Sequence, residues 1–393
     1  MRITFIQTGD FREADLTISA SGQETYHAQQ HSMSVVYRLA ERHEYVSVIS
    51  TDANLPSYSE TLKSGVVTHG FKLYEDGRKH SSDLRQLLEK DRPTHVVLRL
   101  PDPEILQMCL EMGAQVFPVF ADTIGYRPGL RRIVDFFRTR KLASLLKSTD
   151  ISFVGNHNLA ASESLARIGI PRPKIVPWDW PRPFHPGDFP PKTYPAGECF
   201  RLLFVGVVSE GKGIIELLKA LAILKDRDVE LTIVGKGQIE QMREHAEELG
   251  VADRVSFSGQ IPFGDVMDVM RKHDALVVFP RATYAEGMPG VLYQGLAARL
   301  PTILSPHPVF KFFFKDSPGL LMAPSFEPSA LAEAVLSIIT RPQVYEDLSQ
   351  NSGTAFYRIL RDTDWVELVE RWISGTNEDT AWIKARTLDQ ISE

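Results

Sequence analysis

The amino-acid sequence predicts an α/β protein built from two doubly wound domains that face an interdomain cleft. Short β-rich runs alternate with helical patterns, which is typical of parallel strands joined by helices on both faces of a sheet. A proline-rich segment at 181–197 interrupts this alternation. The chain of 393 residues is also too long for one comfortable core and about right for two domains.

The first domain is predicted to span 1–181 and is followed by a linker at 182–199. Its strands are expected at 2–7, 46–51, 65–69, 94–100, 115–121, 151–155 and 174–177. Its helices are expected near 24–43, 80–91, 102–112, 128–147 and 158–168.

The second domain is predicted to span 200–375, where the alternation resumes. Its strands are expected near 201–207, 230–234, 253–257, 274–279, 301–304 and 319–322. Its helices are expected near 212–225, 237–249, 263–272, 289–299 and 327–340, followed by amphipathic helices at 343–360 and 364–375. Ligands bind outside the carboxyl ends of such strands, so the cleft is the predicted active site.

The run at 280–299, PRATYAEGMPGVLYQGLAAR, contains a strand end, a Gly/Pro loop and a helix start. Backbone N–H groups and the positive end of a helix favour an anion there, most often a phosphate. Pro289 suits a first helical turn, and Gly290 lets a ligand approach the main chain. We therefore expect the helix to begin near Pro289.

Five segments of the second half carry a family pattern: FVGVVSEGKG at 204–213, LTIVGKGQ at 231–238, VSFSGQIP at 255–262, DALVVFPRATYAEGMPGVLYQGLA at 274–297 and PTILSP at 301–306. Together they resemble the nucleotide-binding half of a retaining glycosyltransferase of the GT-B fold, glycosyltransferase family 4 (glycosyl transferases group 1). The resemblance implies two Rossmann-like domains and a C-terminal helix, about 376–393, that crosses back to the first domain.

Composition excludes some classes of protein. A net charge of −6 argues against nucleic acid as the main partner. With two cysteines, Cys109 and Cys199, there is neither a disulfide framework nor a zinc pattern, which favours a reducing compartment. No signal peptide and no run of about 18 apolar residues is visible, so we expect a cytoplasmic protein or one peripheral to the inner membrane face.

The resemblance implies that Lys212 contacts the diphosphate of a nucleotide sugar, and that Glu286 lies at the donor sugar and the reaction centre. Cations and helix ends can stabilise a leaving phosphate without a metal, and a carboxylate can stabilise positive charge at the anomeric carbon. The alternatives are a solvated lysine and a glutamate that caps a helix. We expect no catalytic metal and no cofactor. The two aspartate pairs that might suggest a metal lie elsewhere: the pair at 226/228 precedes a strand, at the edge of the sheet away from ligands, and the pair at 362/364 reads as a helix cap.

Two positions depart from the family pattern. Val207 stands where the family often has an arginine, and Arg281, Lys236 and Lys311 are candidates to replace that cation. Gln294 stands in place of the second glutamate, which binds ribose in the family; an amide still accepts one hydrogen bond. The other predicted donor-binding residues border the glycine loops: Gly206, Gly211, Gly235, Gln260, Ile261, Gly287, Met288, Pro289 and Gly290.

Acceptor binding is assigned to strand ends of the first domain, where loops vary with the partner. The candidates are Gly9, Asp10, Gly22, Arg99 and Asp122. A histidine common in the family is missing after the strand at 94–100. Arg99 and Asp102 can equally form a strand-end salt bridge, Asp122 can cap a turn, and His157 reads as structural.

The segment 127–147 carries seven basic residues and one acid, with Phe136 and Phe137 among them. A basic amphipathic helix can contact an anionic membrane, as suits a lipid-linked acceptor. The alternative is an ordinary helix packed on the sheet.

The sequence thus predicts a retaining, metal-independent glycosyltransferase that moves a hexose-type sugar from a UDP- or GDP-sugar to a hydroxyl of a glycan, a lipid-linked molecule or a small molecule. One alternative is a non-catalytic relative that binds a nucleotide or glycan as a partner subunit. A second is an epimerase or phosphorylase with the same fold.

Overall fold

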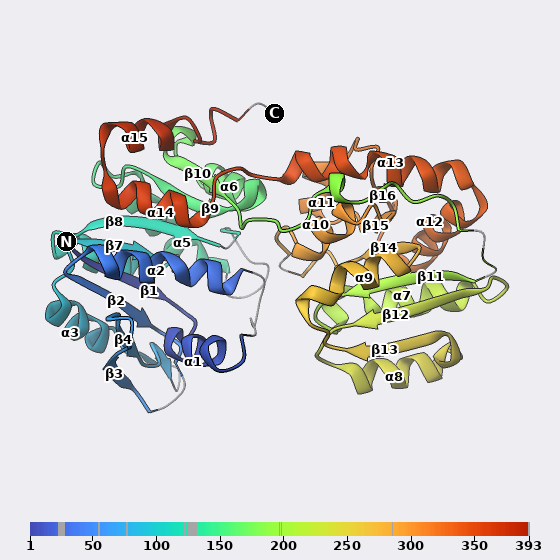
Figure 1. Cartoon of the computed structure of the whole chain (residues 1–393), viewed down its shortest axis with the longest axis horizontal. Helices are drawn as coiled ribbons and strands as arrows, with labels where there is room; N and C mark the ends of the chain where they lie inside the picture. Colours follow the sequence, from blue (N-terminus) through green and yellow to red (C-terminus); the bar gives the residue numbers. More distant parts are fainter. Residues whose placement is uncertain are drawn as a thin grey trace. The chain divides into compact units, whose positions relative to one another are not determined.

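In the computed structural model the chain divides into two compact units (Figure 1). The structure describes residues 1–22, 28–53, 56–75, 78–121, 123–124, 132–195, 197, 199–284 and 286–391. Unit 1 comprises Met1–Pro181 and Arg361–Glu393, and unit 2 comprises Arg182–Leu360. The chain therefore returns to unit 1 at Arg361, earlier than the expected return at about 376.

The sheet of unit 1 has eight strands in the order β10-β9-β8-β7-β1-β2-β4-β3. All neighbouring pairs are parallel except β3 with β4. Because the order runs outward from β1 in both directions, unit 1 is doubly wound as predicted. The strands are β1 (Arg2–Gln7), β2 (Tyr45–Ser50), β3 (Tyr58–Thr61), β4 (Val67–Gly70), β7 (His95–Leu98), β8 (Gln115–Phe120), β9 (Val154–His157) and β10 (Ile175–Trp178), beside a small hairpin of β5 (Tyr74–Glu75) and β6 (Arg78–Lys79).

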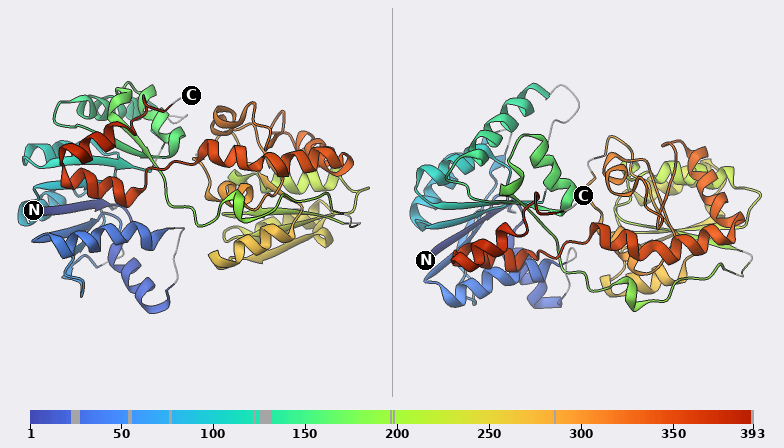
Figure 2. Two further views of the ribbon diagram at one scale, coloured as in Figure 1. Left: turned by 45° about the horizontal axis from the view of Figure 1, so that its top comes forward. Right: turned by 90° about the horizontal axis from the view of Figure 1, so that it is seen from above.

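Helices cover both faces of this sheet (Figure 2). Successive side chains of β1 point to opposite faces of the sheet, and both faces are buried. Ile3 and Phe5 belong to the hydrophobic cluster on one face, and Ile6 belongs to the cluster on the other. The helices are α1 (Phe11–Ser21), α2 (Gln29–Arg42), α3 (Ser81–Asp91), α4 (Pro103–Glu111), α5 (Arg132–Lys147), α6 (Asn158–Arg167), α14 (Trp365–Ser374) and α15 (Asn377–Lys384).

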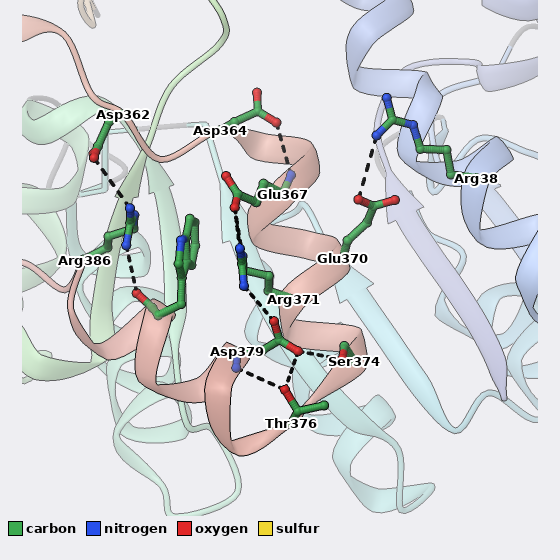
Figure 3. Close-up of polar contacts among 11 residues, drawn as sticks. Arg38, Asp362, Asp364, Glu367, Glu370, Arg371, Ser374, Thr376, Asp379 and Arg386 are labelled. Atoms are coloured by element: carbon green, nitrogen blue, oxygen red, sulfur yellow. Dashed lines mark hydrogen bonds and ion pairs between the residues drawn. The ribbon is translucent and has the colours of Figure 1, made fainter.

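The C-terminal segment completes one face of unit 1. Trp365 at the start of α14 is 1% exposed and packs against Trp178, with ring centroids 5.2 Å apart. Polar contacts then fix the turn between α14 and α15 (Figure 3): Arg371 binds Asp379 at 2.9 Å, and Asp379 accepts from the Thr376 hydroxyl. This packing explains why the chain rejoins unit 1 at α14, before α15.

The sheet of unit 2 has six parallel strands in the order β13-β12-β11-β14-β15-β16, the second doubly wound sheet that the sequence predicted. Its strands are β11 (Phe200–Val205), β12 (Val229–Val234), β13 (Val255–Gly259), β14 (Ala275–Val278), β15 (Thr302–Leu304) and β16 (Leu321–Met322). Its helices are α7 (Ile214–Ile223), α8 (Ile239–Glu248), α9 (Val266–Lys272), α10 (Gly290–Ala297), α11 (Pro308–Phe314), α12 (Pro328–Thr340) and α13 (Pro342–Ile359).

The described part of the predicted linker packs against unit 2. The Tyr194 ring meets the buried Tyr345 ring edge-on at 5.7 Å, and its hydroxyl donates to the Ile339 carbonyl. The Lys192 N–H donates to the Ser349 hydroxyl at 2.7 Å. Residues 182–195 are therefore part of unit 2.

Several elements differ from the prediction. Helix α1, the strands β3, β5 and β6, and helix α11 were not predicted. Helix α2 begins at Gln29, and the first residues of the predicted helix, 24–27, lie outside the described residues. Helix α10 begins at Gly290, with Pro289 as its N-cap in an extended conformation, so Pro289 precedes the first turn.

Candidate functional site

The candidate site lies at the carboxyl edge of the unit 2 sheet. Strands β11 and β14 are hydrogen-bonded neighbours, although three α-helices and two strands lie between them along the chain. Because parallel strands end at the same edge, the loop at 206–213 and the described residues of the loop after β14, 279–284 and 286–289, lie side by side.

Glycine allows the first loop to approach the second. Gly213 has φ +78° and is the N-cap of α7. A Cβ atom there would overlap the carbonyl oxygen of Phe279, at the end of β14. A Cβ atom on Gly211 would overlap the Tyr284 ring. The two loops are therefore held in direct contact by residues without side chains.

Lys212 and Glu286, the two predicted catalytic residues, form an ion pair. The Nζ atom of Lys212 lies 2.5 Å from Oε2 of Glu286 and 4.6 Å from the centroid of the Tyr284 ring. The two side chains are 17% and 8% exposed. The structure thus brings together a cation and a carboxylate that are 74 residues apart.

Helix α10 begins at Gly290, four residues after Glu286. Its N-cap, Pro289, makes no side-chain hydrogen bond to the first turn, and the Glu286 carboxylate accepts from Lys212 instead. Glu286 therefore does not cap α10, which was the alternative role for this residue. The edge of the sheet combines an ammonium group with the positive end of a helix, an arrangement that suits an anion.

The three cations proposed to replace the missing arginine differ in their surroundings. Nε of Arg281 lies 2.8 Å from Glu216, and its Nη1 lies 3.2 Å from Glu210. Lys236 follows β12 and Lys311 lies on α11, and both are exposed. Arg281 is therefore already occupied by two carboxylates.

The remaining predicted donor residues border the same edge. Gly235 follows β12 with φ +147°, and a Cβ atom there would overlap the carbonyl oxygen of Gly206. Gln260 and Ile261 follow β13, and Gln294 lies half-buried in the second turn of α10. Before α10, Gly287 is half-buried and Met288 is 5% exposed.

Sequence reasoning missed Arg182 and His307. Arg182 stacks on Tyr293 at 3.7 Å, and its Nη1 lies 4.0 Å from where a Cβ atom of Gly290 would be. His307 lies 3.1 Å from the Tyr284 carbonyl oxygen, and burial lowers its pKa. The place of His307 just after a strand could have suggested it, whereas nothing in the sequence links Arg182 to α10.

Unit 1 has a cavity of about 300 Å³ at the carboxyl end of β1. Three predicted acceptor residues, Gly9, Asp10 and Arg99, line it, while Gly22 does not and Asp122 lies outside the described residues. The remaining lining residues are Phe5, Gln7, Phe11, Glu13, Ala14, Thr17, Gln29, Ser32, Met33, Val36 and Trp365.

Each polar acceptor candidate in this cavity also has a structural contact. Asp10 caps α1 by accepting from the Glu13 N–H, and it accepts from the Tyr58 hydroxyl at 2.6 Å. Arg99 donates to Gln7 at 3.2 Å and lies 4.8 Å from the Trp365 ring. Asp10 and Arg99 are thus fixed in place around the cavity.

Asp102 and His157 have structural partners. Asp102 is the N-cap of α4 and binds Lys79 at 3.0 Å. His157 lies 3.0 Å from Asp179. The described residues contain no group of three or more His, Cys, Asp or Glu side chains placed to hold a metal ion.

Comparisons with known proteins identify relatives of this chain. Residues 190–354 match the family of glycosyl transferases group 1. A phosphatidyl-myo-inositol mannosyltransferase from Mycobacterium leprae (strain TN) is 30% identical over 167 residues, which is 42% of either chain. A putative teichuronic acid biosynthesis glycosyltransferase, TuaC, from Bacillus subtilis (strain 168) is 30% identical over 158 residues, 39% of this chain and 38% of that protein. The similarity thus spans less than half the length of these relatives.

Solved structures share the fold along almost the whole chain. The structure of Anabaena Alr3699/HepE in complex with UDP and glucose superposes with a TM-score of 0.64 at 14% identity, covering 96% of this chain and all 100% of that one. The lipopolysaccharide biosynthesis glycosyltransferase WaaG superposes with a TM-score of 0.62 at 16% identity, covering 95% and 100%. The predicted GT-B fold is therefore confirmed.

Proposed function

This chain resembles the group 1 glycosyltransferases in residues 190–354 and has the GT-B fold, and we propose that it is a retaining glycosyltransferase. It moves a hexose-type sugar from a nucleotide diphosphate sugar to a hydroxyl acceptor without a metal. The observation that carries this proposal is the Lys212–Glu286 pair beside the uncapped start of α10.

In the proposed reaction the donor diphosphate binds Lys212 and the amides of the first turn of α10. Both stabilise the negative charge that develops on the leaving phosphate. The phosphate displaces Glu286 from Lys212, and the freed carboxylate accepts hydrogen bonds from the donor sugar. A carboxylate there also stabilises positive charge at the anomeric carbon in the transition state.

The remaining groups place the two substrates. Gln294 accepts a hydrogen bond from a ribose hydroxyl, and the backbone at Gln260 and Ile261 borders the base. The acceptor hydroxyl belongs to a glycan, a lipid-linked molecule or a small molecule bound near Gly9 and Arg99. By analogy with the family, the leaving phosphate assists its deprotonation, so no side-chain base is required.

The test combines nucleotide binding with turnover. UDP and GDP are titrated into the protein, and a panel of UDP- and GDP-sugars is assayed for released nucleotide with and without EDTA. The variant Glu286→Ala should keep nucleotide binding and lose at least about a hundredfold in turnover. Turnover that Glu286→Ala leaves unchanged contradicts the site, and turnover abolished by EDTA contradicts the metal-independent mechanism.

Two positions favour a second function, a non-catalytic relative that binds a nucleotide or glycan as a partner subunit. Val207 is 53% exposed where a cation is usual in the family, and Gln294 replaces a carboxylate. Tight binding of UDP or GDP without turnover on any acceptor supports this alternative. An epimerase or phosphorylase is recognised by its products.

We also propose contact with the inner face of a membrane through α5. The side chains of Phe136 and Phe137 are 38% and 65% exposed, beside the exposed Arg140 and Lys141, while Leu142 packs into the core. Residues 127–131 of the predicted basic segment lie outside the described residues. No helix in the described part of the chain is long and apolar enough to cross a membrane. Flotation with anionic liposomes at low salt tests the contact, with Phe136→Ser/Phe137→Ser as the variant that should stay unbound.

A further inference from the structure

Arg281 is bound on both sides by acids of the neighbouring loop and helix. Its Nε lies 2.8 Å from Oε1 of Glu216 on α7, and its Nη1 lies 3.2 Å from Oε2 of Glu210 in the loop after β11. The two carboxylates also raise the pKa of Arg281 above its usual value, although burial alone would lower it. Its guanidinium is thus committed to the protein.

The two acids flank Lys212 in the chain. Glu210 precedes it by two residues, and Glu216 follows it in the first turn of α7. Left without a counter-charge, they would repel a diphosphate and compete with it for the Lys212 ammonium. Arg281 supplies that counter-charge.

The backbone of Arg281 holds the same loop. Its N–H donates to the Gly211 carbonyl at 2.9 Å, and its carbonyl accepts from the Tyr284 N–H at 3.0 Å. The Tyr284 ring in turn lies under the Lys212 ammonium. Through these contacts Arg281 connects the loop that carries Lys212 with the segment that carries the Tyr284 ring.

We propose that Arg281 is a positioning residue for the donor diphosphate. It neutralises Glu210 and Glu216 and fixes the loop at 209–213, so that these two acids do not compete with the donor phosphate for Lys212. This inference rests on the proposed function, since it assumes that Lys212 binds the donor. It also assigns Arg281 a role other than that of a cation in direct contact with phosphate.

The experiment compares the affinities of UDP and GDP with those of UMP and GMP by isothermal titration calorimetry. Arg281→Gln should weaken binding of the preferred diphosphate by about tenfold, on the scale of one charged hydrogen bond. Binding of the matching monophosphate should change by less than about twofold, because a monophosphate lacks the terminal phosphate that carries the leaving-group charge proposed to lie at Lys212. Arg227→Gln, at the exposed amino end of β12, is the matched control.

A rescue distinguishes positioning from direct contact. In the triple variant Arg281→Gln/Glu210→Gln/Glu216→Gln the repelling carboxylates are gone, so most of the lost diphosphate affinity should return. An arginine that touches phosphate itself predicts no recovery. Should circular dichroism show that Arg281→Gln does not fold, Arg281→Lys is tested instead. Lysine keeps the positive charge but has one nitrogen in place of the Nε and Nη1 that bind the two acids, so an intermediate loss of diphosphate affinity is expected.

The outcomes distinguish a failure of the proposed function from a failure of the role proposed for Arg281. A wild-type protein that binds neither UDP nor GDP overturns the proposed function and this inference together. A wild-type protein that binds a diphosphate while Arg281→Gln binds it equally well overturns the inference alone. An equal loss for diphosphate and monophosphate, or no recovery in the triple variant, also overturns it.

Discussion

The ammonium of Lys212 and the carboxylate of Glu286 satisfy each other's charge in a largely buried setting, so that removing either one leaves the other without its counter-ion. We expect Lys212→Met and Glu286→Gln each to lower the free energy of unfolding by about 1–3 kcal/mol. The free energy of unfolding of the double variant should fall by less than the sum of the two single losses. Urea unfolding of all four proteins measures this coupling.

The exposed ion pair between Arg243 and Glu240, 3.7 Å apart, is the control for this cycle. Its coupling should lie below about 0.5 kcal/mol because solvent screens exposed pairs. Strictly additive losses at Lys212 and Glu286 would show that the pair makes no energetic contribution in the free protein.

A second prediction concerns Gly213, which lets the loop after β11 lie against the end of β14. Gly213→Ala places a methyl group on the Phe279 carbonyl and strains a backbone at φ +78°. We expect it to destabilise unit 2 by more than about 3 kcal/mol and to abolish nucleoside diphosphate binding. Thermal unfolding and calorimetry measure the two effects.

Gly250→Ala is the control that measures the cost of backbone strain alone, without an overlap. Gly250 has a similar φ of +66°, but a Cβ atom there meets nothing within 4 Å. The free energy of unfolding should fall by only about 1 kcal/mol in Gly250→Ala, and nucleotide binding should be normal. Equal losses at the two glycines would refute the overlap with Phe279 as the cause.

The fold was largely predictable because periodicity reports burial. Most residues of β1 and β11 are buried, and such strands read as short, mostly apolar runs between helical patterns. Helix α1 was missed because its sequence, FREADLTISAS, is polar and follows β1 after only three residues. Helix α11, PVFKFFF, is apolar on nearly all sides and gives no helical period.

The candidate site was predictable only in part. Lys212 and Glu286 were predicted as site residues from motifs, but their contact depends on β11 and β14 becoming neighbours, which no local pattern encodes. Arg281 was considered as a phosphate ligand because it follows a predicted strand. Its observed partners, Glu210 and Glu216, are 71 and 65 residues away, so the sequence did not reveal them. Arg182 was missed for the same reason.

A third prediction concerns the response of unit 1 to acid. Burial alone would raise the pKa of Asp102, but hydrogen bonds from Lys79 and from the start of α4 outweigh it and lower the pKa below the ordinary value of 3.8. The unfolded chain therefore takes up this proton first as the pH falls. The stabilisation is complete above about pH 4 and is lost as the pH falls through the lowered pKa.

Asp102→Asn removes this contribution while keeping a side chain that can cap α4. We expect lower stability at pH 6 and a shallower decline between about pH 4 and pH 2 than in the wild type. Urea unfolding across that range tests it, with Asp83→Asn, at a side chain 55% exposed, as the control. An unaltered pH dependence in Asp102→Asn would mean that the Lys79 contact does not stabilise the folded state.

The last prediction tests whether the cavity beside β1 receives the acceptor. Thr17 lines this cavity from an exposed position on α1, so Thr17→Phe can narrow the cavity without entering the core. We expect the KM for the acceptor to rise by about tenfold or more, while the KM for the donor stays unchanged, because the variant removes binding space on unit 1 alone. Leu16→Phe, at the preceding position on the same helix but outside the cavity lining, is the matched control. A Thr17→Phe enzyme with normal acceptor kinetics would place the acceptor elsewhere on unit 1, and a change in donor KM alone would connect the cavity with the donor.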